Sequence, residues 1–231
     1  MPAHRLTALG SAISRSDVVA FDTKGVTHFL QHTALSAHEY ESVKAGDEIG
    51  VNHMGPPLER DGQCRVDVSG TAELNDDELN QIALFIDELE DERQAQVLRQ
   101  RSDIDKYPDY IVHPHTDYSP DGSYRRFSCT GYVVEAYAEA GIDLIDIDAV
   151  PPVDLQMIYR AFPALERVEA NPPLRKRSGI RSRHDLGLAG DGPWRVLLPG
   201  YVLHSLARDA DAIRRDPYSP TSGDECFPRS A

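Results

Sequence analysis

Cys129 is the residue in this 231-residue chain that could best serve as a nucleophile. It lies in the stretch RRFSCTGYVVEAYAEAGIDL, residues 125–144, where a short polar turn meets a helical pattern, and Arg125 and Arg126 precede it. Unpaired amide groups at a helix N-terminus, together with nearby cations, favour a thiolate over a thiol. The alternative interpretation of such a cysteine is a small buried core residue.

The residues around Cys129 resemble the nucleophile helix of NlpC-type peptidases. That family's pattern is an aromatic residue, a short gap, Cys, Ser or Thr, Gly, an aromatic residue, Val, and a helix that ends in Ala-Gly-Ile. The matching residues here are Phe127, Cys129, Thr130, Gly131, Tyr132, Val133 and Ala140-Gly141-Ile142. The resemblance implies a cysteine that attacks a carbonyl carbon.

Two histidines before the cysteine give the chain an order that resembles circularly permuted papain-like proteins, such as the lecithin:retinol acyltransferase group. FLQHTAL, with His32, is similar to the first histidine strand of that group, and GVNHMGPP, with His53, is similar to the second. The resemblance implies that His32 takes the thiol proton and that His53 holds the His32 imidazole in one tautomer. His28 and His38 are close rivals for these roles. A long acidic helix between the histidines and the cysteine departs from the usual pattern.

A second candidate site lies in IVHPHTD, which contains His113, His115 and Asp117. Alternate residues of an extended segment point to one side, so two imidazoles could share a zinc ion. The spacing resembles the metal loop of metallo-β-lactamase-type hydrolases, although Tyr118 stands where those enzymes usually have another histidine. A polar loop that lines the cysteine site is the alternative interpretation.

The elements that must position these residues are predicted from hydrophobic periodicity. Strands are expected at 17–22, around 49–54 and at 64–70. An amphipathic helix is expected over about 75–102, because Leu79, Ile82, Ile86 and Leu89 recur at spacings of three and four. A second helix should begin near Cys129 and end at Gly141.

Composition restricts the classes of function. A formal net charge of −14 argues against non-specific binding of nucleic acid. The chain has no apolar run of about eighteen residues and no secretory signal, so we expect no membrane span. Three cysteines cannot form a disulfide framework and indicate a reducing compartment, so we expect a cytoplasmic protein.

The sequence therefore predicts an α+β, papain-like domain of permuted NlpC type over residues 1–215, followed by a flexible tail at 216–231. An antiparallel sheet should pack on the Cys129 helix, with the helix at about 75–102 as an insertion. The predicted activity is hydrolysis of a peptide or isopeptide amide by Cys129, His32 and His53, without a metal or organic cofactor. A lipid ester substrate, a metal-dependent hydrolase and an inactive papain-like binding module are the alternatives.

Overall fold

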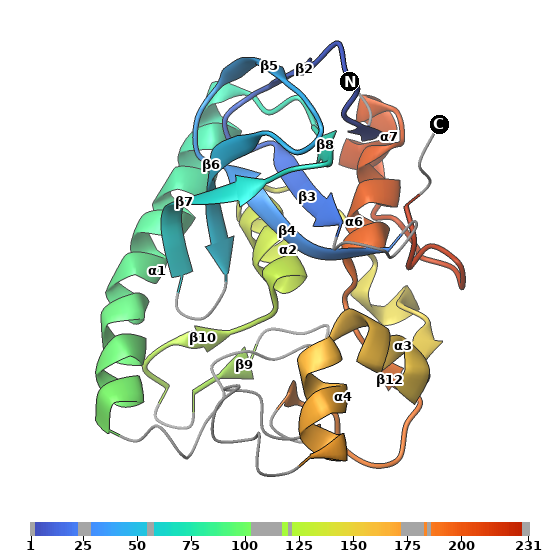
Figure 1. Ribbon diagram of the computed structural model, residues 1–231. Coiled ribbons are helices and arrows are strands. Elements are labelled where there is room, and N and C mark those ends of the chain that lie inside the picture. The colour runs from blue at the N-terminus through green and yellow to red at the C-terminus, as the bar shows by residue number, and fades with distance from the viewer. Residues whose placement is uncertain are drawn as a thin grey trace.

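A six-stranded antiparallel sheet organises the chain, in the order β1-β8-β3-β4-β6-β7 (Figure 1). The computed structural model describes residues 3–22, 29–54, 58–102, 117–119, 122–171, 183 and 186–227. The sheet strands are β1 (His4–Arg5), β3 (Val18–Asp22), β4 (Leu30–Ser36), β6 (Glu48–Met54), β7 (Leu58–Arg65) and β8 (Val68–Gly70). Three two-stranded sheets pair β2 (Ser11–Ile13) with β5 (Tyr40–Val43), β9 (Asp117–Tyr118) with β10 (Arg125–Arg126), and β11 (Pro152–Val153) with β12 (Trp194–Arg195).

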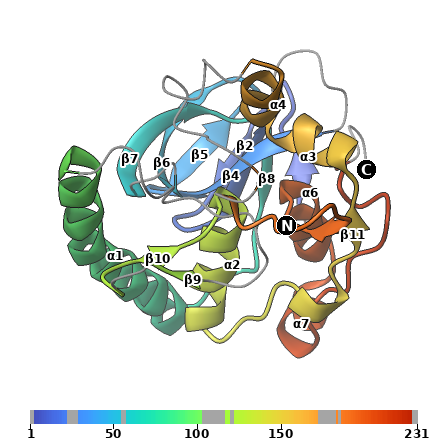
Figure 2. The same ribbon diagram turned by 90° about the horizontal axis from the view of Figure 1, so that it is seen from below.

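Six α-helices are described: α1 (Asp76–Ser102), α2 (Cys129–Glu139), α3 (Leu155–Ala161), α4 (Pro163–Ala170), α6 (Pro199–Leu206) and α7 (Ala210–Arg215). A 3₁₀ turn, η1 (Ile147–Ala149), precedes α3. Figure 2 shows α1 on one side of the molecule, α3 and α6 on the other, and α2 between them. The described part of the chain is therefore a mixed α+β fold, as the sequence predicts at this coarser level.

The sheet separates two apolar cores because successive strand side chains point to opposite faces. In β3, Val18 and Ala20 join the larger core beneath α2 and α6, whereas Val19 joins a smaller core under β2 and β5. The β-branched residues of β3 and β6 suit this two-sided burial. The strands predicted at 17–22 and 49–54 are confirmed as β3 and β6.

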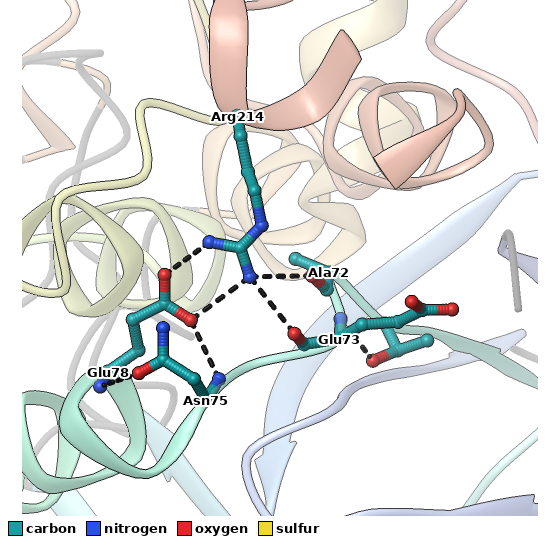
Figure 3. Close-up of polar contacts among 6 residues, drawn as sticks. Ala72, Glu73, Asn75, Glu78 and Arg214 are labelled. Carbon is teal, nitrogen blue, oxygen red and sulfur yellow. Dashed lines mark hydrogen bonds and ion pairs between the residues drawn. The ribbon is translucent and has the colours of Figure 1, made fainter. Parts of the chain in front are cut away.

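The N-terminal end of α1 is fixed by a reciprocal cap and by Arg214 from α7 (Figure 3). The Asn75 amide donates to the Glu78 carboxylate at 2.8 Å, and the Glu78 amide donates back to the Asn75 side chain at 3.0 Å. The Arg214 guanidinium donates to both Glu78 carboxylate oxygens and to the carbonyls of Ala72 and Glu73. This network joins the long helix to the C-terminal part of the chain.

The predicted helix at about 75–102 is confirmed, and its apolar face is buried at Ile82, Phe85, Ile86 and Leu89. The second predicted helix is confirmed as α2. It ends just before Gly141, whose φ is 78°. A glycine adopts this left-handed conformation without the penalty that a Cβ atom would impose.

Two expectations differ from the structure. The strand predicted at 64–70 is the end of β7 and the separate strand β8, because the chain leaves β6 and crosses to β3 at residues 66–67. The tail predicted to be flexible at 216–231 is packed as far as Phe227, which is buried, and Tyr218 bridges to Ile145. Residues 228–231 lie outside the described residues. Among the described residues, no helix has both the length and the apolarity needed to cross a membrane.

Candidate active site

Cys129 is the first residue of α2, and the helix start holds it against strand β4. Ser128 is the N-cap, and its hydroxyl accepts a hydrogen bond from the Gly131 amide at 3.0 Å. The thiol lies 3.9 Å from the Gln31 carbonyl oxygen and 4.0 Å from the Thr130 hydroxyl. Only 2% of Cys129 is exposed. The amides of the first helical turn have no acceptor within the helix, so this terminus favours a negative charge on the sulfur.

His32 on β4 is the partner of Cys129. Burial lowers the pKa of His32, but hydrogen bonding with Cys129 and the negative charge of the Cys129 thiolate together raise it above the ordinary value. Nδ1 of His32 is buried and has no hydrogen-bond partner among the described residues. A thiol beside an imidazole is the arrangement that a nucleophile and its base require.

Strand register brings His53 and Phe21 to the same face of the sheet as His32. Phe21 lies directly opposite His32 on β3, and their rings stack with centroids 5.2 Å apart. The β4–β6 register pairs Leu35 with Asn52, so its continuation sets His53 opposite Ala34. His53 is then diagonal to His32, which is a separation that ring side chains span. The two imidazole centroids are 5.6 Å apart.

His53 is held in its neutral form. Burial and the nearby charge of His32 lower the pKa of His53 to about 4. Its Nε2 atom is buried and, like Nδ1 of His32, has no hydrogen-bond partner among the described residues. These two nitrogens belong to rings in edge-to-face contact, at an interplanar angle of 69°. A neutral imidazole has one acceptor nitrogen, but no hydrogen bond joins these two nitrogens in the described structure.

The segment that leads into α2 is anchored by Arg125. Its guanidinium donates to the Glu92 carboxylate of α1 at 2.8 Å, and the Arg125 amide donates to the same carboxylate at 2.6 Å. The guanidinium also lies 5.0 Å from the centroid of the Phe85 ring. On the other side of the cysteine, the Thr33 hydroxyl donates to the Thr130 hydroxyl at 3.5 Å. The predicted insertion α1 thus helps to position the start of α2.

Of the rival histidines, only His38 lies within the described residues, and it does not join this group. His38 is exposed and pairs with Asp61 at 2.9 Å. His28, His113 and His115 lie outside the described residues, and of Asp117 only its place in strand β9 is described. No group of three potential metal ligands occurs within the described ranges.

Sequence reasoning missed Phe21 and Gln31 as parts of the site. Phe21 belongs to the predicted strand at 17–22, and an antiparallel pairing of that strand with the histidine strand would have placed it beside His32. The Gln31 carbonyl gave no signal, because any residue type supplies a main-chain carbonyl.

Comparison of the chain with protein-family models, with curated proteins and with solved structures found no match.

Proposed function

We propose that this protein is a thiol hydrolase that cleaves an amide bond through an acyl-enzyme at Cys129, with a papain-like fold of permuted NlpC type. The observation that carries the proposal is the interaction of Cys129, at the start of α2, with His32, whose pKa it raises. The chain order of His32, His53 and Cys129, on an antiparallel sheet with the helix packed against it, supports the permuted topology.

The proposed reaction begins with transfer of the thiol proton to the imidazole of His32. The thiolate attacks the carbonyl carbon and a C–S bond forms. The C–N bond then breaks as the His32 imidazolium gives its proton to the leaving amine. Water attacks the thioester while His32 accepts its proton, the C–S bond breaks, and the acid leaves. The sulfur and the imidazole then return to their starting states.

The charge arrangement favours amides over esters as substrates. An amine leaves as a neutral molecule only if it is protonated, whereas an alkoxide leaves more readily without a proton. A raised pKa at His32 keeps the imidazole protonated after the thiol has ionised. The oxyanion that forms during attack would lie near the amides of Cys129 and Thr130, at the positive end of α2. A reduced thiol is required, which suits a reducing compartment such as the cytoplasm.

The decisive experiment is the pH dependence of alkylation at each cysteine, resolved by mass spectrometry. The other two cysteines, Cys64 and Cys226, are internal references, and burial raises the pKa of the Cys64 thiol. In the wild type, Cys129 should react with iodoacetamide with a midpoint well below that of an ordinary thiol, about 8.5. In His32→Ala the midpoint should move upward. A Cys129 that is inert, or that reacts like the reference cysteines, would refute the thiol mechanism.

Activity is then tested with matched amide and ester substrates. Cys129→Ser and His32→Ala should both abolish amide hydrolysis, while His38→Ala should leave it unchanged because His38 pairs with Asp61 at the surface. Hydrolysis of esters alone would contradict the proposed role of His32 as a general acid. A reactive Cys129 without activity on any carbonyl substrate would instead indicate a papain-like binding module.

A further inference from the structure

Arg160, on helix α3, is a cation that strand β4 connects to the cysteine through Gln31. The Gln31 side chain donates a hydrogen bond to the Arg160 carbonyl at 3.1 Å, and the Gln31 carbonyl itself lies 3.9 Å from the Cys129 sulfur. One residue of β4 therefore contacts both the nucleophile and the turn of α3 that bears this arginine.

The guanidinium of Arg160 is directed back along β4. Its central carbon lies 4.7 Å from the centroid of the Phe29 ring, two residues before Gln31. A strand advances roughly 3.3 Å per residue, which places this cation on the order of 10 Å from the sulfur. The Phe29 ring is buried and covers one face of the guanidinium, while Arg160 as a whole is exposed. A substrate held at the sulfur could therefore reach it.

The charge of Arg160 is not neutralised within the described residues. No carboxylate there lies within ion-pair distance of it. Arg160 differs from other arginines without such a partner in its contact with Gln31, whose carbonyl lies at the Cys129 sulfur. In a chain with a net charge of −14, a cation near the sulfur would locally offset the repulsion of anions. A planar guanidinium is also well suited to bind a carboxylate or phosphate with two hydrogen bonds.

We propose that Arg160 binds an anionic group of the substrate, a carboxylate or a phosphate, several bonds away from the carbonyl that Cys129 attacks. The inference rests on the proposed function, and it adds the substrate class to it. The amide substrates would bear a negative charge on the acyl side or the amine side, close to the scissile bond. Gln31 contacts both the Arg160 main chain and the Cys129 sulfur, so it would fix the distance between them.

Two alkylating probes that differ only in charge test this inference without a known substrate. N-iodoacetylglycine and its neutral amide, N-iodoacetylglycinamide, place a carboxylate or a carboxamide at the same distance from the reacting carbon. In the wild type, Cys129 should react about two- to tenfold faster with the acid than with the amide, as expected for one charge at this distance. Arg160→Gln should remove the preference and Arg160→Lys should keep it, with the ratio of the two probe rates as the readout in each variant.

Arg65→Gln is the matched control. It removes the same charge from the opposite end of the sheet, where Arg65 pairs with Glu48 at the start of β6. This variant should keep the preference for the acid. If it loses the preference as fully as Arg160→Gln does, the effect is one of net charge and the inference is wrong. Circular dichroism and thermal melting check that each variant is folded.

Competition with free anions separates binding from a long-range field. At an ionic strength held constant with chloride, succinate or inorganic phosphate should slow the acid probe in the wild type and not in Arg160→Gln. The more effective competitor identifies the group. Inhibition by neither anion would overturn the binding site. Equal rates of the two probes at a rapidly reacting Cys129 would refute the Arg160 inference alone. A Cys129 as slow as Cys64 and Cys226 with the neutral probe would refute the proposed function, and the inference with it.

Discussion

Replacement of His53 by glutamine should make the protein less sensitive to mild acid. His53 is largely buried, and its pKa is lowered from 6.5 to about 4. Between these values the unfolded chain binds a proton at this residue that the folded chain does not bind. Stability therefore rises with pH across this window and is lost as the pH falls through it. A glutamine of similar size at position 53 does not titrate, so the variant lacks this contribution.

The magnitude follows from the shift. A change of one pKa unit corresponds to about 1.4 kcal/mol, so the full penalty below the folded pKa is about 3 kcal/mol. Most of it falls between about pH 7 and pH 5, where the wild type should lose about 2 kcal/mol relative to the variant. Titration of the carboxylates affects both proteins alike, so it cancels in the difference.

Urea unfolding at a series of pH values measures this difference directly. The free energy of unfolding of the wild type minus that of His53→Gln should fall steadily as the pH is lowered from about 7 to 5. A difference that stays constant over this range would show that His53 is not buried in its neutral form. The reasoning about the neutral partner of His32 would then fail as well.

Three further substitutions test how the site is held. Ser128→Ala should cost about 1 kcal/mol of stability, measured by urea unfolding, because it removes the N-cap of the nucleophile helix. Gly200→Ala should destabilise by about 1–3 kcal/mol, because a Cβ there would lie 2.3–2.6 Å from main-chain atoms of residues 224–225; an unchanged melting temperature would show that this segment is not packed. Arg214→Ala should lower the free energy of unfolding by about 1–2 kcal/mol, because charged hydrogen bonds are lost. This decrease should become smaller at low pH. The bond from Arg214 lowers the pKa of Glu78, so it stabilises the fold only while that carboxylate is ionised.

The helices were predictable from the sequence because their signals are local. The spacing of Ile82, Ile86 and Leu89 defines one face of α1, and Gly141 marks the end of α2. The two strands within residues 64–70 were not predictable in the same way. The alternation of apolar and polar side chains continues from β7, which pairs with β6, into β8, which pairs with β3. The Asp67 amide donates to the Ala20 carbonyl on β3, whereas Cys64 still pairs with Ile49 on β6. A hydrophobic period of two residues predicts a strand but does not predict which strand it pairs with.

The residues of the candidate site could be proposed from the sequence, but their geometry could not. The resemblance around Cys129 and the order of the histidines suggested which side chains to consider. Their meeting depends on the order β3-β4-β6 and on a register that sets His53 diagonal to His32, and both are long-range properties of the sheet. The C-terminal tail shows the opposite limit, because a Pro- and Ser-rich composition suggested flexibility while Phe227 and Tyr218 supply the contacts that fix it.

The neutral state of His53 bears on how the proposed nucleophile would work. Two imidazolium rings with centroids 5.6 Å apart would repel each other, so protonation of one disfavours protonation of the other. The proton would reside on His32, whose pKa is raised by Cys129, and not on His53. A carboxylate in the place of His53 would bind the imidazolium more strongly and make it a weaker acid toward the leaving amine. A neutral ring packed edge-to-face against His32 limits its orientation while leaving its proton available, which is what amide cleavage at this site would require.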